Sequence, residues 1–207
     1  MNIIYEIRPI CGKEWLPDRC MATGIPLHIR DSSPQYGCPG FLFGNPGIRN
    51  RIDFEDFYRN VLNRFSGCGF VAWEKGAVIG YTNFFPHGIA QKIKFYGWGE
   101  AEDEQPDTLV HHCVSIVQNP DYRHKGIGGN LLRHSLEWAK ANKWRRYEVH
   151  HVLPDNEKGI ADNQKSVLSF WRKLGFSISG EEEADNDTRE YYGVNTRYSL
   201  ALDLDSF

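Results

Sequence analysis

The segment from Val114 to Leu132 constrains the fold more than any other part of the chain. An apolar, β-branched stretch there leads through a basic, glycine-rich turn into apolar residues at helical spacing. The first stretch is typical of a central strand over 108–118. One face of the helix predicted over 127–140 is formed by Ile127, Leu131, Ser135, Trp138 and Ala139. A strand that turns directly into an amphipathic helix predicts an α/β chain.

Further strands and helices are predicted on both sides of this segment. Strands are expected over 3–7, 70–74, 77–82, 147–153, 176–179 and 196–204, and Lys75-Gly76 is expected to be the turn of a hairpin. A helix over 54–65 has Asp53 as its expected N-cap, and another helix, ending at Leu174, has Gly175 as its expected C-terminal cap.

These elements predict an α/β fold with a mixed sheet of about seven strands and three to four helices. Residues 1–207 are predicted to form a single domain. The stretch 11–51 is rich in Gly, Pro, Asp and Ser, and it is expected to be an extended loop with short helices. The acidic stretches 100–107 and 181–187 are expected to be connections.

Composition and charge exclude several classes of protein. With 24 Lys and Arg against 27 Asp and Glu, the formal net charge is -3, which gives no electrostatic case for binding nucleic acid. A hydrophobic content of 41% is ample for a packed core. The start of the chain does not resemble a signal peptide, and no apolar run approaches the ~18 residues of a membrane span. No membrane partner is therefore expected.

The cysteines indicate a reducing compartment. There are five, an odd number, and none belongs to a C-x-x-C pair. This pattern favours neither a disulfide framework nor a zinc site, so we expect no metal and a cytoplasmic location.

The turn that precedes the predicted helix has the chemistry of an anion site. The first backbone N–H groups of a helix have no partner within the helix, and the helix dipole adds partial positive charge there. The missing side chains of Gly126 and Gly128 would let a diphosphate approach the backbone closely. A P-loop is excluded because the G-x-x-x-x-G-K-[ST] pattern is absent, and Leu131 stands where the dinucleotide fingerprint requires its third glycine.

Two motifs together resemble one enzyme family. The residues Arg123-x-x-Gly126-x-Gly128 resemble the pyrophosphate-binding motif [QR]-x-x-G-x-[GA] of the GNAT acetyltransferase superfamily. Downstream, Asn163 followed by Phe170-Trp171-Arg172-Lys173-Leu174-Gly175-Phe176 is similar to that family's asparagine and "Y-E-K-L-G-F" helix. Pro120, before the arginine, and Leu131-Leu132, after the glycines, also match the pattern of that family. The resemblance covers 5–8 and 52 to the end of the sequence, and it leaves 11–51 unexplained.

The resemblance implies a fold, a donor substrate and a set of contacts. The fold would have mostly antiparallel strands with a splayed central pair, and the donor would be acetyl-CoA. The backbone of the strand before the turn would contact the pantetheine arm, through Ile116, Val117 and Gln118. The residues expected to bind the cofactor are Ile116, Val117, Gln118, Arg123, His124, Lys125, Gly126, Ile127, Gly128, Gly129, Asn163 and Phe170.

The resemblance also implies N-acetyl transfer by direct attack of an amine on the thioester. An alkylammonium has a pKa near ~10.4 and must lose its proton first. Family members with a base on this strand carry a glutamate or histidine at the spacing of His112, so His112 is the candidate base; a core histidine is the alternative reading. His111 points to the opposite face and is expected to be structural.

One departure from the family pattern bears on the leaving group. The family commonly supplies a tyrosine at the position of Trp171, whose indole N–H can donate a hydrogen bond but cannot titrate. Tyr191, Tyr192 or water are the alternatives for protonating the thiolate. Because of this departure, one alternative function is that of a non-catalytic acyl-CoA sensor. A second alternative is a nucleotide-binding domain that uses the same glycine turn.

The acceptor is the least constrained part of the prediction. The acidic stretches 100–107 and 181–187 would attract a cationic amine on a small molecule or a peptide, and Tyr96 and Trp98 could hold it by cation–π contact. Ordinary solvated acidic turns are the alternative. The protein is expected to be a monomer or a homodimer.

Overall fold

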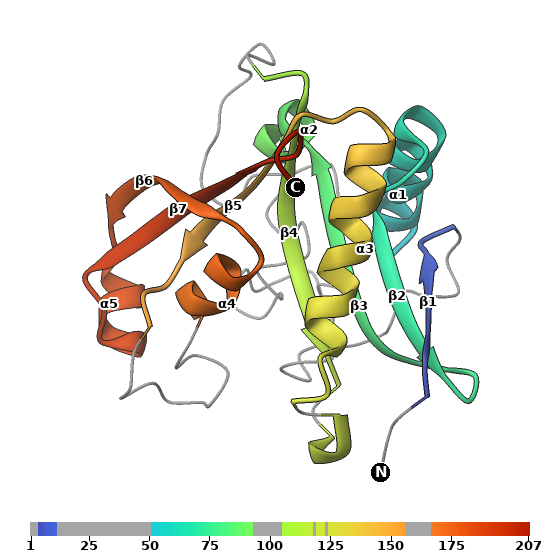
Figure 1. Ribbon diagram of the computed structural model, residues 1–207, viewed down its shortest axis with the longest axis horizontal. Helices are drawn as coiled ribbons and strands as arrows, with labels where there is room; N and C mark the ends of the chain where they lie inside the picture. Colours follow the sequence, from blue (N-terminus) through green and yellow to red (C-terminus); the bar gives the residue numbers. More distant parts are fainter. Residues whose placement is uncertain (1–3, 12–50, 93–104, 118, 123, 156–166) are drawn as a thin grey trace. The chain divides into compact units, whose positions relative to one another are not determined.

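The computed structural model describes residues 4–11, 51–92, 105–117, 119–122, 124–155 and 167–207. They include seven strands: β1 (Glu6–Pro9), β2 (Gly69–Glu74), β3 (Ala77–Pro86), β4 (Thr108–Ile116), β5 (Arg146–Val152), β6 (Ser177–Glu183) and β7 (Thr196–Asp203). The helices are α1 (Arg51–Phe65), α2 (His87–Lys92), α3 (Ile127–Ala141), α4 (Val167–Lys173) and α5 (Asn186–Tyr192), with a short 3-10 helix, η2 (Pro120–Tyr122) (Figure 1).

The strands form one sheet in the order β1-β2-β3-β4-β5-β7-β6. The pairs β1–β2, β2–β3, β5–β7 and β6–β7 are antiparallel, whereas β4 and β5 are parallel. This arrangement confirms the predicted α/β fold with a mixed, mostly antiparallel sheet of seven strands. The described residues hold five α-helices, more than the three to four predicted, because α2 and α5 are short and lack the apolar spacing that indicated α4.

The described residues belong to two compact units. One lies within Met1–Pro106 and His112–Trp138, and the other within Asp107–His111 and Ala139–Phe207. The boundary falls inside β4, between His111 and His112. A single catalytic domain over 1–207 stays a prediction, and residues 12–50 of the loop-rich stretch lie outside the described residues.

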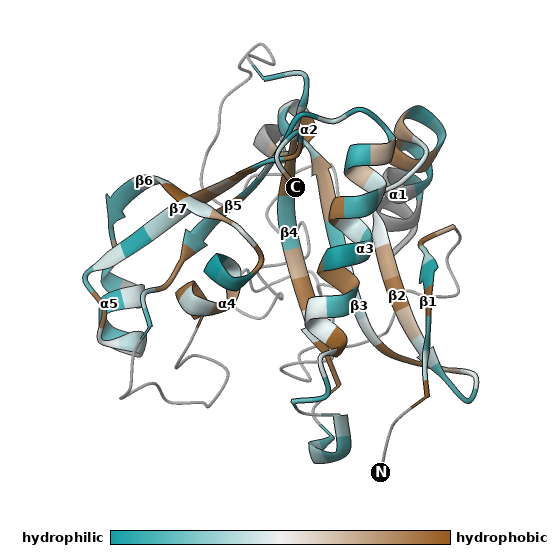
Figure 2. Ribbon diagram, viewed as in Figure 1, coloured by the Kyte–Doolittle hydropathy of each residue, from teal (hydrophilic) through white to brown (hydrophobic). Residues whose placement is uncertain are grey.

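In the first unit, α3 packs on β3 and β4. A methyl group added at Gly80 of β3 would come within 2.6 Å of the Ile116 side chain and 3.4 Å of Leu131 on α3, so glycine permits this close approach. Phe84 of β3 contacts Trp138 of α3 with ring centroids 5.2 Å apart. The predicted face of α3 is buried except for half-buried Trp138, and Leu132 and Leu136, which were not predicted, are buried as well. Figure 2 shows the matching apolar residues along β2, β3 and α3.

The β2–β3 hairpin follows the sequence prediction. Lys75 and Gly76 both have positive φ, 50° and 83°, as a tight two-residue hairpin turn requires. The space around Gly76 is open, with nothing within 4 Å of an added Cβ. The preceding helix differs from its prediction at one end: α1 begins at Arg51, so Asp53 lies inside its first turn and is not the N-cap.

In the second unit, Tyr147, Trp171 and Phe176 form an aromatic core with His111. All four are buried, and Trp171 lies edge-on to His111 and Phe176 at centroid distances of 4.9 and 5.1 Å. As predicted, α4 is followed by Gly175 at a positive φ of 95°. Residues 181–187 are not a connection, because 181–183 complete β6 and α5 begins at Asn186.

The described helices are all too short or too polar to span a bilayer. In the same residues, no group of three or more His, Cys, Asp or Glu side chains is arranged to hold a metal ion.

Candidate functional site

The turn between β4 and α3 has an unusual backbone. His124 has a φ of 56° and Gly126 a φ of 74°, so the chain passes through the left-handed region twice before α3 begins at Ile127. The first helical bond of α3 runs from the Asn130 N–H to the Gly126 carbonyl, at 2.9 Å. The N–H groups ahead of that bond are those that a helix cannot satisfy by itself.

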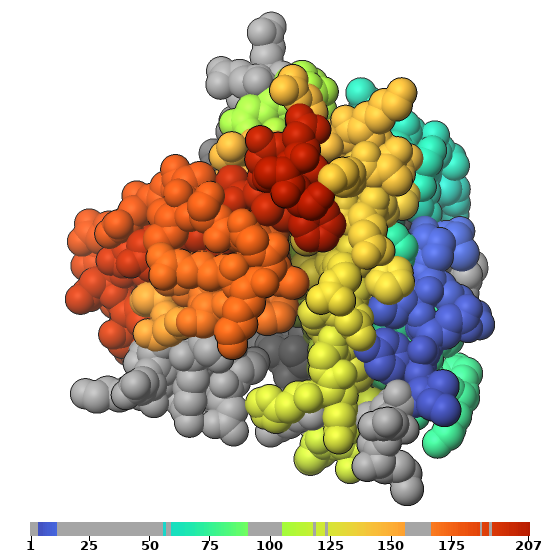
Figure 3. Space-filling model, viewed as in Figure 1, coloured from blue at the N-terminus to red at the C-terminus, as the bar shows by residue number. Residues whose placement is uncertain are grey.

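Among the described residues, there is open space beside the glycines of this turn. A Cβ added at Gly126 or Gly129 would meet nothing within 4 Å, and one at Gly128 would meet only Val114, at 3.7 Å. His124, Lys125 and Gly126 are exposed, and Figure 3 shows this part of the chain at the surface. Exposed backbone N–H groups with partial positive charge are suited to a diphosphate.

Two side-chain contacts hold this turn. On its strand side, the Tyr122 hydroxyl of η2 donates to the Glu74 carboxylate at the end of β2, which raises the pKa of Tyr122. On its helix side, Asn130 Nδ2 donates to the Tyr5 hydroxyl at 2.5 Å. Elements distant in sequence therefore fix both ends of the turn, and the amides need little reorganisation to receive a ligand.

The backbone N–H and C=O groups of β4 point alternately toward the two sides of the strand. The Val117 N–H donates to the Ile79 carbonyl of β3 at 3.0 Å. Because successive residues of a strand direct their backbone groups to opposite sides, the N–H and C=O of Ile116 face the other edge. On that edge, the pairing of β4 with β5 covers Thr108 to His111 within the described residues, although both strands continue. The backbone of Ile116 is therefore better placed than that of Val117 to receive a further extended group.

The two adjacent histidines of β4 lie in different surroundings. His111 is buried, with its Nδ1 3.3 Å from the Tyr147 hydroxyl, which agrees with its predicted structural role. His112 is only partly buried, and its ring lies edge-on to Phe85 at a centroid distance of 5.5 Å. His112 therefore differs from His111 in being partly exposed as a residue, although its Nε2 atom is buried.

His112 and Cys113 of β4 both contact aromatic residues of β3. Phe84 packs on α3, so Phe85 and Tyr81 lie on the opposite face of β3. His112 contacts Phe85, and the next residue, Cys113, lies 3.9 Å from the Tyr81 hydroxyl. Both side chains thus contact residues of β3 on the face that points away from α3.

The indole of Trp171 belongs to the core of its unit. It is 5% exposed and packs against His111, Phe170 and Phe176. Phe170 is half-buried beside it, with ring centroids 5.5 Å apart. Of the other predicted site residues, Gln118, Arg123 and Asn163 lie outside the described residues, as do Tyr96 and Trp98.

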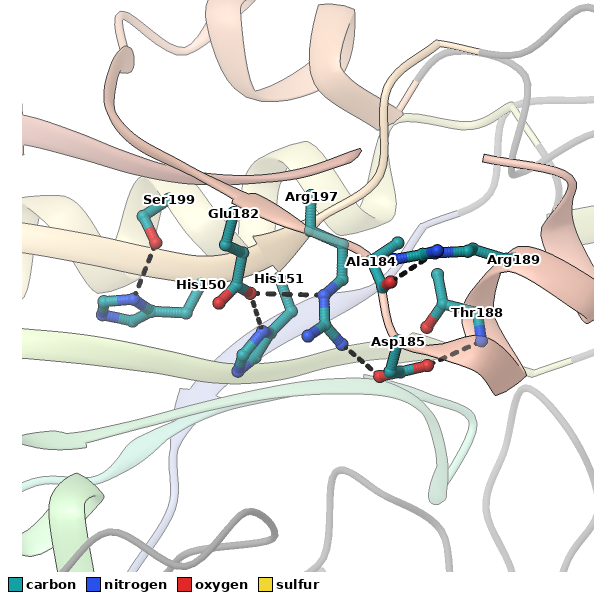
Figure 4. A network of polar contacts seen from close by, with 9 residues as sticks. All are labelled: His150, His151, Glu182, Ala184, Asp185, Thr188, Arg189, Arg197 and Ser199. Carbon is teal, nitrogen blue, oxygen red and sulfur yellow. Dashed lines mark hydrogen bonds and ion pairs between the residues drawn. The ribbon is translucent and has the colours of Figure 1, made fainter. Parts of the chain in front are cut away.

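A polar cluster on β5, β6 and β7 was missed by the sequence reasoning (Figure 4). His150 contacts Glu148 and Ser199, each at 3.1 Å, and His151 Nδ1 lies 2.6 Å from Glu182. Arg197 bridges Glu182 and Asp185 at 3.2 and 2.7 Å. The repeated histidine of 150–151, two residues after a glutamate, was the only signal in the sequence.

Burial and charge set the protonation of this cluster. Burial lowers the pKa of His151 and outweighs the opposing effect of Glu182. For Glu148, burial raises the pKa, but hydrogen bonds from His150 and Arg146 outweigh it, so the net shift is downward. Glu148 is thus an ionised carboxylate at neutral pH although only 5% of the residue is exposed.

Curated proteins with related sequences are acetyltransferases. The chain is 30% identical over 122 residues to an N-alpha-acetyltransferase of Sulfurisphaera tokodaii, covering 58% of this chain and 62% of that protein. It is 24% identical over 101 residues to the peptidyl-lysine N-acetyltransferase YjaB of Escherichia coli, covering 47% of this chain and 59% of that protein. The chain therefore spans about three fifths of the length of these two relatives.

Solved structures share the fold. An acetyltransferase of the GNAT family from Streptococcus pneumoniae superposes with a TM-score of 0.60 at 14% identity, covering 97% of this chain and 99% of that one. An N-acetyltransferase from Staphylococcus aureus Mu50 gives a TM-score of 0.57 at 19% identity, with the same coverage. The family model "Acetyltransferase (GNAT) family" matches residues 38–176, more than half of the sequence. The chain therefore belongs to the GNAT family of acetyltransferases.

Proposed function

We propose that this protein transfers an acetyl group from acetyl-CoA to a primary amine of a small molecule or a peptide. The observation that carries this proposal is the β4–α3 turn, where positive φ at His124 and Gly126 presents amides to open space in a chain of the GNAT family. As an acyl donor, acetyl-CoA brings a thioester and a diphosphate that suits such a turn.

The residues of the turn fit the donor. The amides of Ile127, Gly128 and Gly129 would hold the diphosphate, and the space beside Gly126 and Gly129 leaves room for it. Exposed Lys125 adds positive charge to this turn, beside exposed His124. The backbone of Ile116 would pair with the extended pantetheine arm at the β4 edge that faces away from β3.

His112 is our candidate for the general base. Its ring carries a nitrogen with an unperturbed pKa near ~6.5, which suits removal of a proton from an ammonium at neutral pH. Contact with Phe85 holds the ring, and the residue is partly exposed although its Nε2 atom is buried. Holding amine and thioester together supplies up to ~7–11 kcal/mol of the barrier reduction, and deprotonation by a base supplies roughly 10²–10⁴-fold more in rate.

Protonation of the leaving thiolate does not fall to Trp171. An indole N–H cannot titrate, and the ring is packed into the aromatic core. Water or Tyr192, which is partly buried at the end of α5, remain the candidates for this step.

A peptide amine is the acceptor class that the relatives favour. One relative is a peptidyl-lysine N-acetyltransferase, and another is an N-alpha-acetyltransferase. The two activities differ only in whether the attacking nitrogen is a side-chain or an α-amino group. The α-amino group has the lower pKa, near ~7.7–8.0, and needs the base less.

The deciding experiment is release of free CoA thiol from acetyl-CoA with a panel of peptides and polyamines. Peptides with a blocked N-terminus and one lysine are matched with peptides that have a free N-terminus and no lysine. Turnover on either set supports the proposal and identifies the class. Tight CoA binding without turnover on any amine would instead assign the protein as an acyl-CoA sensor, and thermal stabilisation by NAD or ATP but not by CoA would overturn the proposal.

A further inference from the structure

Three polar side chains on β5 and β7 are connected by consecutive hydrogen bonds. The Ser199 hydroxyl lies 3.1 Å from His150 Nδ1, and His150 Nε2 lies 3.1 Å from Glu148 Oε2. Glu148 and His150 are two residues apart on β5, so their side chains share one face of the strand. The order hydroxyl, imidazole, carboxylate is the order in which a serine nucleophile is activated.

For a neutral imidazole, these hydrogen bonds allow only one arrangement of protons. Glu148 is ionised and also accepts from Arg146 Nε at 2.5 Å, so it can only accept from the imidazole. A neutral His150 must then carry its proton on Nε2, which leaves the lone pair of Nδ1 for the Ser199 hydroxyl. The two ring nitrogens have exchanged roles relative to the serine hydrolase template, but the proton path from hydroxyl to imidazole is intact.

The sheet is irregular on both sides of Ser199. On β5, Val149 pairs with Leu200 and Val152 with Tyr198, so His150 and His151 together oppose Ser199. On β6, the register shifts between Ile178 and Gly180 at the same level of β7. Bulges interrupt the hydrogen-bond ladder and redirect side chains, and they occur often beside active sites.

Backbone strain coincides with these bulges. His151 has a φ of 58°, in the left-handed region that non-glycine residues seldom adopt. Across the ladder, Ser199 faces Gly180, whose missing side chain reduces crowding on that side of the hydroxyl: an added Cβ would lie 4.0 Å from Ser199 Oγ. The His150 side chain is 23% exposed, and Ser199 is only partly buried.

We propose that Ser199 is an activated nucleophile that takes up a short acyl group from an activated ester or thioester. His150 is its base, and Glu148 positions His150. This site lies within β5 and β7, and neither the β4–α3 turn nor His112 contributes to it.

The step transfers one acyl group and balances without a further reactant. Ser199 Oγ forms a bond to the acyl carbon while His150 Nδ1 takes the hydroxyl proton. The bond from the acyl carbon to the leaving oxygen or sulfur then breaks, and the proton passes from His150 to the leaving group. The interrupted ladder at the two bulges is where backbone N–H groups can stabilise the oxyanion.

The test uses two reagents that need neither CoA nor an amine. A fluorophosphonate probe labels activated serines, and p-nitrophenyl acetate leaves an acetyl group on the serine and releases a coloured phenolate. We expect one label per chain, located by peptide mass spectrometry on Ser199, and a phenolate burst equal to the protein concentration. Ser199→Ala should abolish both signals.

Variants of the two supporting residues separate activation from simple exposure. His150→Gln keeps a polar side chain but removes the base, and it should slow labelling by roughly 10²–10⁴-fold. The matched control is His151→Asn, because Asn tolerates positive φ and His151 contacts Glu182 instead of Ser199. It should label like the wild type. In Glu148→Gln, the pH profile of labelling should change, because an amide can donate to the ring and favour the wrong tautomer.

A second measurement keeps the proposal testable if a variant at Glu148 or His150 unfolds. In Ser199→Cys, a neighbouring imidazole should lower the pKa of the thiol below the ~8.5 of a free cysteine, and alkylation by iodoacetamide against pH reports it. Absence of a Ser199 label together with an ordinary thiol pKa would overturn the proposal and assign the three residues to structure. Either result leaves the thiol-release assay for amine acetylation unaffected, so the two proposals fail separately.

Discussion

The β4–α3 turn and the β5–β7 cluster show two ways of building a site. The turn consists mostly of backbone: its features are positive φ at His124 and Gly126 and open space beside the glycines. The cluster consists of side chains, with His150, Glu148 and Ser199 brought together by strands that are distant in sequence. A backbone site leaves a contiguous signature of glycines, whereas a side-chain cluster leaves none that can be recognised before the strands are paired.

The comparison also separates two histidines. His112 contacts the aromatic ring of Phe85, whereas both ring nitrogens of His150 have polar partners. If amine acetylation depends on the first region alone, variants there should affect turnover far more than variants in the cluster.

The largest expected effect is at His112. His112→Ala should lower turnover of acetyl-CoA with an amine by roughly 10²–10⁴-fold and leave CoA affinity unchanged, because it removes a base and no donor contact. Steady-state kinetics and calorimetric CoA titration check the two parts. His134→Ala, at an exposed histidine of α3, is the control. Wild-type turnover in His112→Ala would mean that this residue serves only packing, and it would contradict the expected difference between the two regions.

The next effect is on binding at the turn. In Gly128→Val, the added side chain would occupy the space that the diphosphate needs, since a Cβ there has only Val114 nearby, at 3.7 Å. Loss of about two hydrogen bonds to a charged group, at ~1.5–3 kcal/mol each, corresponds to at least roughly 10²-fold weaker CoA binding. Ala141→Val, exposed at the end of the same helix, controls for the helix propensity of valine. Equal CoA affinity in both variants would place the diphosphate elsewhere.

The smallest expected effect is on the stability of the protein, through the N-cap of α5. Asp185 caps α5 by accepting from the Thr188 N–H at 2.7 Å, and its other oxygen accepts from Arg197. Asp185→Asn keeps a capping side chain, whereas Asp185→Ala should cost about 0.5–2 kcal/mol of unfolding free energy. Urea denaturation of the two variants side by side measures the difference. A similar stability for alanine and asparagine would show that the cap contributes nothing.

The same cap predicts a dependence on pH. The hydrogen bonds from Thr188, and then the charge of Arg197, hold the pKa of Asp185 below its usual value. A lowered folded-state pKa contributes stability that is present above the unfolded value, near ~3.9, and is lost as the pH falls through the folded value. Asp185→Ala should therefore differ from the wild type at pH 7 and converge with it in acid.

The sequence predicted the elements whose local signals agree with their surroundings. The hairpin at Lys75-Gly76 follows from turn chemistry, and α4 with Gly175 follows from apolar spacing and a positive φ. The end of β6 was mispredicted because Glu181, Glu182 and Glu183 have poor strand propensity. The pairing of Glu182 with Arg197 and His151 overrides that propensity, and it could not be read from a sequence whose strands were not yet paired.

The hydrogen bond between Tyr122 and Glu74 has a practical consequence. Glu74 immediately precedes the exposed Lys75-Gly76 tip, and Tyr122 lies between β4 and α3. This hydrogen bond therefore links the β4–α3 turn to an exposed loop that can be modified chemically. If the turn binds the acyl donor as we propose, an environment-sensitive dye attached at position 75 would report that binding as an optical signal.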